Sequence, residues 1–434
     1  MSYDTIKLLN LEDFDIEISS FEVTKVNNIL HCYLKLKRGN DNCIVCGSTN
    51  LTIKDYRQKK IVHSISTNSP CYIIYLARRY KCVICDKIFY ENNPFAMDYQ
   101  KISLYTQMAV LEALKDHTTT FTNIAGRFNL TKVTVINIFD SYVNCTRRKL
   151  PEIICMDEFY TARLSRTKYA FVMLDFVQNK IIDIYSSRHK FFLANQFNQI
   201  PKHERNNVKY IIIDMWDTYK DLANLYFNRS QIAVDSFHVI KHLNNAMNSI
   251  RLRIMRKFDT KTNRLIENDK YYYMLKKFHY FFTKTYDDIY SGKIAIRKMK
   301  TKWHKDEIRK YLLSIDIDLA YAYWLKEKYR EFNLTANYES CDEELEYFID
   351  EFTNSHLEEF RMFGRLLRNW KQEIKNSFIR INGKRLSNAP IEGVNSRIKT
   401  IIKNANGYQN FNRLRNRIIY SINKDVPLKG NPKN

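Results

Sequence analysis

Short apolar runs predict five strands in the middle of the chain, and helical apolar spacing predicts two helices between the last three of them. The strands are expected at residues 153–157, 169–175, 181–185, 208–214 and 232–235. The helices are expected at residues 191–197 and 219–227. A turn at Gln178 and Asn179 makes the first three strands a meander.

This order of elements predicts an RNase H-like fold, in which the first and fourth strands lie side by side and parallel. Asp157 ends the first strand and Asp214 ends the fourth, so we expect their carboxylates to face one cleft. Glu158 points to the opposite side of the strand, because side chains alternate along a strand. Asp235 also ends a strand and competes with these two residues for the same role.

A further carboxylate is expected on a helix near the C-terminal end of the chain. In the segment 386–403, Glu392, Asn395 and Lys399 fall on one helical face, and the apolar residues fall on the other. Between this segment and the last strand, residues 240–385 show mostly helical patterns, at 243–257, 270–285, 317–332 and 343–378. We interpret them as an all-α insertion. The stretch 271–282 interleaves aromatic and basic residues, which fits either DNA stacking or a helix core.

Two C-x-x-C motifs precede this region, Cys43 with Cys46 and Cys82 with Cys85. Each spacing lets both sulfurs reach one ion, and four thiolates complete the tetrahedron of a structural zinc site. A strand at 71–81 and alternating stretches at 20–36 predict a small β-rich zinc ribbon within residues 1–95. The alternative is a set of free buried cysteines.

Residues 100–150 predict a helix-turn-helix. A helix at 103–116 is followed by two short helices with a tight turn near Asn129 and Leu130. The packing positions should include Ala125, Phe128, Val133, Val135, Ile136 and Phe139. Thr131 is the expected N-cap of the second helix, which would expose Lys132, Thr134 and Asn137 to a major groove, with Arg147 and Arg148 as a basic bridge to the next domain. A purely structural helical hairpin is the alternative.

Charge makes a polyanion the expected partner. The 434 residues include 70 Lys and Arg against 47 Asp and Glu, a formal charge of +23. Since no apolar stretch is long enough to span a bilayer and the N-terminus lacks the order of a signal peptide, we expect a cytoplasmic protein with no membrane association. An odd number of cysteines favours reduced thiols.

Two strand-end aspartates and a helical glutamate on a basic chain favour metal-dependent chemistry on a nucleic-acid backbone. Asp157, Asp214 and Glu392 are the predicted catalytic ligands of two Mg²⁺ or Mn²⁺ ions, because hard oxygen ligands suit these metals. Asp235, His238, Asn395 and Lys399 are predicted to support them, His238 by positioning a phosphate or water.

Together these motifs resemble the bacterial DDE transposases of the ISL-three insertion-sequence family. The resemblance rests on the paired C-x-x-C motifs, the helix-turn-helix, and the blocks at 156–159, 213–216, 235–239 and 387–396. It implies an RNase H-like catalytic domain with a helical insertion. We place this domain at 151–239 and 386–424, and residues 425–434 are expected to form a tail. The resemblance also implies binding of terminal inverted repeats in double-stranded DNA, with cleavage and strand transfer by a freed 3′-hydroxyl.

Two other functions share many of these features. One is a DNA-binding regulator with an inert RNase H-like domain, and the other is a structure-specific nuclease that cuts without joining. Joining two transposon ends suggests at least a homodimer on DNA, in the bacterial cytoplasm at the nucleoid.

Overall fold

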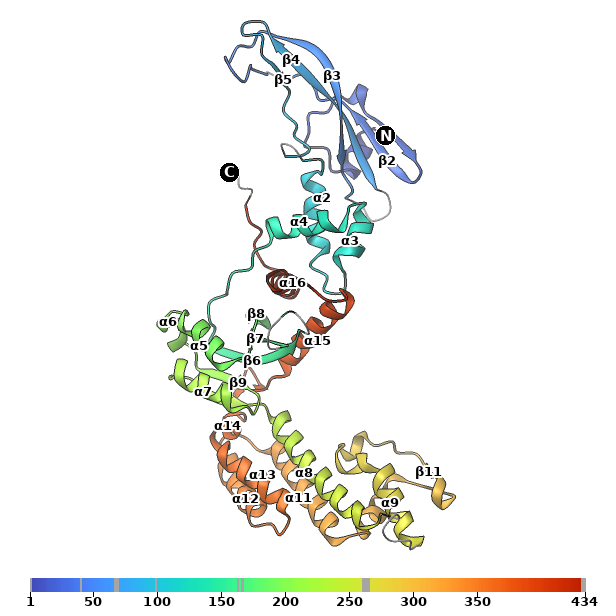
Figure 1. Cartoon of the computed structure of the whole chain (residues 1–434), viewed down its shortest axis with the longest axis vertical. Coiled ribbons are helices and arrows are strands. Elements are labelled where there is room, and N and C mark those ends of the chain that lie inside the picture. Colours follow the sequence, from blue (N-terminus) through green and yellow to red (C-terminus); the bar gives the residue numbers. More distant parts are fainter. Residues whose placement is uncertain are drawn as a thin grey trace. The chain divides into compact units, whose positions relative to one another are not determined.

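The computed structural model describes residues 2–39, 41–65, 70–97, 100–161, 164, 168–259 and 266–430. The chain divides into two compact units (Figure 1). Unit 1 comprises Met1–Arg147, Thr161–Ser165 and Val394–Asn434, and unit 2 comprises Arg148–Tyr160 and Arg166–Gly393. Within the described residues, no helix is long and apolar enough to cross a membrane. The last four residues of the predicted tail, 431–434, lie outside the described part.

Unit 1 contains a five-stranded sheet with the order β1-β2-β4-β3, to which β5 adds by pairing with β4. The central strand β4 is buried along most of its length because its aromatic and aliphatic residues fit a pleated, covered surface. The strand predicted at 71–81 is confirmed, and it pairs in parallel with β2, which lies within the segment 20–36. The strands are β1 (Glu22–Val26), β2 (Ile29–Leu34), β3 (Leu51–Val62), β4 (Cys71–Cys82) and β5 (Ile88–Tyr90).

The predicted helix-turn-helix is present in unit 1. Asn129 ends α3 with a left-handed φ of 54°, and the Thr131 side chain accepts a hydrogen bond from the Thr134 N–H at the start of α4. The prediction that Val133 packs between the helices is wrong, because its side chain is 65% exposed. Ile138 packs inward instead. The helices of this unit are α1 (Ser2–Leu8), η1 (Ile18–Ser20), α2 (Leu104–Ala113), α3 (Phe121–Phe128), α4 (Lys132–Tyr142) and α16 (Phe411–Asn423).

Helix α16 is fastened to the helix-turn-helix by a buried arginine. The Arg417 guanidinium donates hydrogen bonds to the carbonyls of Leu114 (2.5 Å), Asp116 (2.8 Å) and Thr119 (3.0 Å). The Tyr420 hydroxyl donates to the Leu111 carbonyl at 3.1 Å. These contacts add donors to carbonyl groups at and beyond the C-terminal end of α2, where the intrahelical hydrogen bonds run out.

Unit 2 is built on a mixed sheet with the order β10-β9-β6-β7-β8. The first and fourth strands of this sheet along the chain, β6 and β9, are parallel neighbours, as predicted, with Ile153 opposite Tyr210. β10 continues the parallel part, and β7 and β8 are antiparallel. The strands are β6 (Ile153–Tyr160), β7 (Tyr169–Asp175), β8 (Lys180–Tyr185), β9 (Tyr210–Ile213) and β10 (Gln231–Val234).

The rest of unit 2 is mostly helical, and two short antiparallel strand pairs lie between its helices. The 240–385 segment is mostly helical, but it also contains the pairs β11–β12 and β13–β14. The long helix predicted at 343–378 is three helices, since α12 ends near Asn354 and α13 ends at Trp370. The elements are α5 (Lys190–Asn198), α6 (Lys202–Asn206), α7 (Asp217–Tyr226), α8 (Ser236–Lys257), α9 (Ile266–Lys277), η2 (His279–Phe282), η3 (Tyr286–Asp288), β11 (Ile294–Ile296), η4 (Arg297–Met299), β12 (Thr301–Trp303), α10 (Lys305–Ser314), α11 (Ile317–Thr335), α12 (Cys341–Thr353), α13 (Glu358–Asn369), α14 (Lys371–Asn376), β13 (Arg380–Ile381), β14 (Lys384–Arg385) and α15 (Ala389–Asn404).

One apolar core runs from the sheet of unit 2 into its helices. It includes strand residues such as Ile154 and Ile211 and helix residues such as Ile250 and Phe352, all essentially inaccessible to solvent. The Asn376 side chain donates a 2.7 Å hydrogen bond to the Ile232 carbonyl of the edge strand β10. A shared core fixes the ends of the strands, where the polar residues described next lie.

Candidate functional site

Three aspartates lie just beyond the carboxyl ends of the parallel ladders of unit 2. β9 and β10 end at Ile213 and Val234, and Asp214 and Asp235 come next in the chain. The parallel ladder between β6 and β9 ends at Cys155, two residues before Asp157. Asp157 does not end its strand as predicted, because β6 continues to Tyr160 and pairs there with β7.

Both carboxylate oxygens of Asp214 have a partner within unit 2. His238 Nε2 lies 3.1 Å from Oδ2, and the Asn388 side-chain amide donates a 2.8 Å hydrogen bond to Oδ1. Asp235 is the N-cap of α8 and accepts a hydrogen bond from the Phe237 N–H, so His238 lies in the first turn of that helix. The strand end and the helix start thus direct Asp214 and His238 toward each other.

Asp235, His238 and Glu392 form a group with metal-ligating donors. One ligand atom from each lies within 4.8 Å of the others. Glu392 lies in the first turn of α15, where its backbone N–H donates to the Asn388 carbonyl at 3.0 Å. Among the predicted residues, the structure therefore groups Glu392 with Asp235 and His238, and it joins Asp214 to this group through His238.

Burial and mutual repulsion act on these acids. Burial, followed by the charge of Asp214, raises the pKa of Asp157 to about 8, and Glu392 adds to the effect. Burial also raises the pKa of Asp214, against the opposing effects of His238 and the Asn388 amide. Burial raises the pKa of Asp235, while the Phe237 N–H and His238 oppose the shift. Carboxylates crowded in this way are stabilised by a bound cation.

Asn388 is the residue that the sequence analysis missed. It is 1% exposed, its backbone N–H opposes the rise in the pKa of Asp235, and its side-chain amide donates a hydrogen bond to Asp214. Its Oδ1 is buried and has no hydrogen-bond partner among the described residues. The only sequence signal was its position four residues before Glu392, at the start of the predicted helix.

The donor chemistry of this group fits divalent cations. Carboxylates dominate it, one imidazole accompanies them, and a buried amide oxygen without a partner is held beside Asp214. Glu158 contributes differently, because Arg188 (2.7 Å) and the Tyr219 hydroxyl (2.6 Å) hold its carboxylate.

Asn395 and Lys399 lie further along α15, in the part of the helix that belongs to unit 1. Asn395 is buried, and Lys399 is exposed. The supporting roles predicted for these two residues stay predictions.

Four cysteines of unit 1 form a second group of potential metal ligands. The sulfurs of Cys43, Cys46, Cys82 and Cys85 lie within 4.8 Å of one another. The Cys43 and Cys85 sulfurs are 3.5 Å apart, and the Cys46 and Cys82 sulfurs are 3.6 Å apart. The backbone N–H groups of Cys46 and Val45 lower the pKa of Cys43 to about 6, which favours the thiolate that binds metal.

The two C-x-x-C loops share one backbone plan. In each loop the first cysteine N–H donates a 2.9 Å bond to a carbonyl five residues later, in Ser48 and Lys87. The residue after each second cysteine is left-handed, Gly47 at φ 71° and Asp86 at φ 53°. The spacer side chains point to solvent and are all apolar and 51–70% exposed: Ile44, Val45, Val83 and Ile84.

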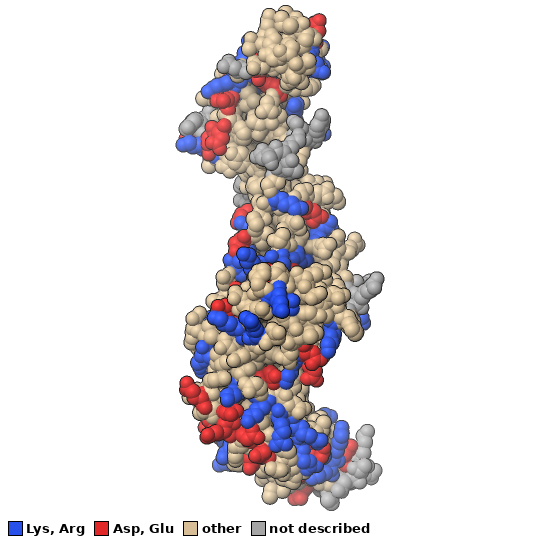
Figure 2. All heavy atoms as spheres, turned by 90° about the vertical axis from the view of Figure 1, so that its left-hand side faces the viewer, with Lys and Arg blue, Asp and Glu red and all other residues tan. Residues whose placement is uncertain are grey.

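The predicted DNA-reading residues lie on and beside α4. Lys132 and Asn137 are exposed, whereas the hydroxyls of Thr131 and Thr134 lie 2.8 Å apart, so the two threonines order the start of the helix. Arg147 and Arg148 are half-buried in the extended segment after α4. Figure 2 shows Lys and Arg side chains distributed over both units on the face it draws.

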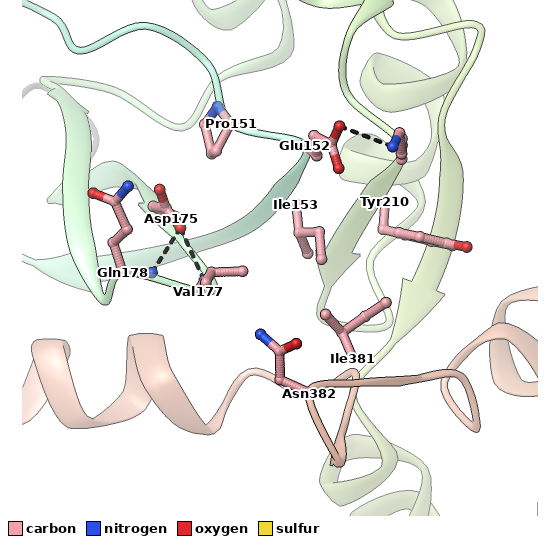
Figure 3. A pocket seen from close by; sticks show the side chains of 10 residues that line it. Pro151, Glu152, Ile153, Asp175, Val177, Gln178, Tyr210, Ile381 and Asn382 are labelled. Atoms are coloured by element: carbon pink, nitrogen blue, oxygen red, sulfur yellow. Dashed lines mark hydrogen bonds and ion pairs between the residues drawn. The ribbon is translucent and has the colours of Figure 1, made fainter.

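A hollow of about 520 Å³ in unit 2 lies away from the carboxylates, beside the amino ends of the same strands (Figure 3). Ile153 and Tyr210, the first residues of β6 and β9, line it. Its polar groups are satisfied locally: Asp175 accepts from the Val177 and Gln178 N–H groups, and Glu152 pairs with Lys209 at 2.8 Å. We assign no chemistry to this hollow.

Two family models match the chain. One, described as a transposase of the DDE type of ISL3, matches residues 154–418. The other, described as the helix-turn-helix domain of transposase family ISL3, matches residues 91–143. No curated protein matches the chain.

Proposed function

Because the chain belongs to the ISL3 family of DNA-binding transposases, we propose that it cleaves the ends of its own insertion sequence and transfers the freed 3′-hydroxyl ends to target DNA. The observation that carries this proposal is the convergence of Asp214, Asp235, His238 and Glu392 at the carboxyl ends of parallel strands. The sheet order and the parallel β6–β9 pair support an RNase H-like domain.

Asp157, Asp214 and Glu392 would hold the catalytic cations, Mg²⁺ or Mn²⁺. Bound there, two divalent ions would activate an attacking oxygen and stabilise the leaving oxygen of the phosphodiester. Asp235 and His238 support the site: Asp235 starts α8, and that helix presents the His238 ring to Asp214. Asn388 fixes the Asp214 carboxylate from the other side.

The protein groups act by holding and orienting. In the cleavage step, water attacks a phosphorus atom, its proton leaves to solvent or to a nearby base, and the 3′-oxygen departs and is protonated. In the joining step, the oxygen of that 3′-hydroxyl attacks a target phosphodiester as its proton leaves to solvent or to a nearby base, and the target 3′-oxygen departs and is protonated. Neither step needs a covalent bond to the protein, so positioning and charge account for catalysis.

The domains of unit 1 would select the DNA. Lys132 and Asn137 are exposed on α4 and are suited to base edges in a major groove, while Thr131 and Thr134 order the start of that helix. Arg147 of unit 1 and the next residue, Arg148, with which unit 2 begins, would contact phosphates. The four-cysteine group would hold one structural Zn²⁺, since four thiolates suit this metal. We also propose that the active form on DNA is at least a homodimer, because two ends must be joined.

The decisive experiment uses a labelled duplex that carries the element's own end, incubated with the full chain and Mg²⁺ or Mn²⁺. We expect metal-dependent cutting at the end, followed by joining when target DNA is added. Asp214→Asn should reduce the cutting rate at least about 10³-fold, whereas Asp217→Asn, an exposed acid on α7, should cut normally.

Two outcomes would replace the proposal. Cutting without joining, with supplied 3′-hydroxyl ends, would indicate a structure-specific nuclease. Tight binding of the end by both proteins, without any cutting under either metal, would indicate a DNA-binding regulator.

A further inference from the structure

A short β-hairpin in the helical part of unit 2 carries a solvent-facing row of unpaired cations. β11 and β12 pair antiparallel, with Ala295 opposite Lys302, and η4 connects them. In Figure 1 the hairpin lies at the edge of this unit, beyond α9. Residues 290–310 contain eight Lys or Arg and two acidic residues, a formal excess of six positive charges.

The side chains of this hairpin divide cleanly between its two faces. Ile296 is buried, and Ile294, Thr301 and Trp303 are half-buried toward the protein, where Trp303 packs on Tyr311. The exposed positions are Lys293, Ala295, Arg297, Lys298, Lys300, Lys302 and His304. Lys302 lies on β12, Lys293 immediately precedes β11, and Arg297 and Lys300 lie in and just after η4. The cations are therefore spread along the hairpin and its turn and are not concentrated at one point.

Four of these cations have no acidic partner. Among the described residues, no ion pair or hydrogen bond engages the side chains of Lys293, Arg297, Lys300 and Lys302. Two other cations near the hairpin have partners in the protein. Lys298 pairs with Asp269, and the Lys277 ammonium donates to the Ala295 carbonyl at 2.8 Å. The hairpin is therefore held in place by some cations while others face outward.

A merely solvated charged surface usually mixes both signs, and unit 2 does so elsewhere. Helix α12 contains six acidic residues and no Lys or Arg, but cations of neighbouring helices balance them, as in the Lys371–Glu346, Lys375–Asp342 and Arg368–Asp350 pairs. Nothing comparable balances the hairpin within the described residues. Its charge is available to an external polyanion.

We propose that the outward face of the β11–β12 hairpin binds the phosphate backbone of double-stranded DNA, as a contact separate from the helix-turn-helix. A two-stranded ribbon fits the width of the major groove, and small Ala295 at its centre allows close approach. The inference rests on the DNA-binding family of the chain and does not require that the carboxylates cut DNA. Tyr271 of α9 does not contribute to it, since its ring packs on Phe258 and Tyr311.

The test measures binding of the full chain to a duplex of arbitrary sequence, over a series of salt concentrations and in the presence of EDTA. The variant replaces Lys293, Arg297, Lys300 and Lys302 with Gln. The control removes the same charge from four exposed positions elsewhere in unit 2, Lys202, Arg229, Lys328 and Lys384. The double variant Lys300→Glu with Lys302→Glu serves as a second probe if the fourfold variant folds poorly.

We expect the hairpin variants to bind the duplex at least about tenfold more weakly, and the fourfold variant to lower the slope of log affinity against log salt by about 2 to 4. The control should change both quantities much less. Equal losses of affinity in the hairpin variant and the control would show that only net charge matters, and this would overturn the proposal. Unchanged binding by the hairpin variant would also overturn it. Hairpin-dependent binding to phosphatidylserine vesicles without an effect on the duplex would assign the surface to membranes instead. Since no cutting is measured, a failure of the catalytic proposal leaves this result interpretable.

Discussion

The two groups of potential metal ligands are assembled in opposite ways. The cysteine group comes from two loops with the same spacing and the same backbone hydrogen bonds, each complete within a few residues. The carboxylate group draws on Asp214, Asp235, His238 and Glu392, which only the sheet order and the start of α15 bring together. The sequence therefore predicts the complete ligand set of the cysteine group. For the carboxylate group it predicts single residues, and the fold decides which of them come together.

The largest expected effect is the loss of a cysteine ligand. Cys82→Ser should remove about one equivalent of bound zinc, because a structural zinc site needs all its thiolates. Zinc content by elemental analysis and limited proteolysis should show the loss and a newly cleavable region around residues 41–90, with unit 2 resistant. Cys341→Ala, buried in unit 2, is the control and should retain the metal. Zinc retained by Cys82→Ser would contradict the four-thiolate site.

The assembled site should respond more gradually to changes in its support. Asn388→Ala removes the amide from Asp214 while leaving the carboxylates in place, so we expect about 10- to 100-fold weaker Mn²⁺ binding and a comparable loss of cutting rate. Binding of Mn²⁺ can be followed by its magnetic resonance signal without any DNA. Asn388→Asp adds a charge and tests geometry separately. Full Mn²⁺ affinity in Asn388→Ala would show that the amide does not position Asp214.

The helix-turn-helix, although its signals in the sequence are local, also depends on a contact from Arg417, which lies far away in the chain. Arg417→Met removes the donors to the carbonyls of Leu114, Asp116 and Thr119, although the Asp116 carbonyl keeps the Thr119 hydroxyl as a donor at 3.0 Å. We expect unit 1 to lose about 3 kcal/mol of stability, consistent with charged hydrogen bonds in a buried setting. Chemical denaturation of the variant should show an earlier transition for this unit. Arg127→Met, on the exposed side of α3, should leave the transition unchanged.

The smallest expected effect is a pH dependence in unit 1. His63 is fully buried, with Nδ1 2.8 Å from the Ser103 hydroxyl and Nε2 2.6 Å from the Leu9 carbonyl, and burial lowers its pKa. An unfolded histidine titrates near 6.5, so only the unfolded state gains a proton just below that pH. Stability should fall as pH decreases below about 6.5, by at most about 1.4 kcal/mol per pH unit.

This dependence can be isolated by comparing the wild type with His63→Gln between pH 5 and pH 8. The difference in the free energy of unfolding should shrink as the pH falls. A constant difference over this range would show that His63 is not held neutral.

Much of the fold was readable from the sequence because its signals are local. The helix-turn-helix follows from the Thr131 cap and the left-handed turn at Asn129, and the strand order follows from apolar runs. Val133 was misplaced because Val133 and Val135 are both apolar, yet positions two residues apart point to nearly opposite sides of a helix and cannot both face the core.

What could not be read depends on contacts between distant segments. The apolar pattern does not predict that Arg417 donates hydrogen bonds to carbonyls some 300 positions earlier in the chain. Asn388 looked like part of a helix start, and its role appears only when β9 places Asp214 beside it. Likewise, the β11–β12 hairpin was hidden in a stretch with too few apolar residues to predict a strand.

The exposed apolar tips of the two cysteine loops favour self-association of a protein that its net charge otherwise keeps apart. Ile44, Val45, Val83 and Ile84 stay in water while most of the chain repels its own copies through positive charge. Concentrated ammonium sulfate, used to strip nucleic acid, would screen that repulsion and strengthen apolar attraction together. Turbidity should then increase with sulfate, and Ser at these four tips should delay its onset.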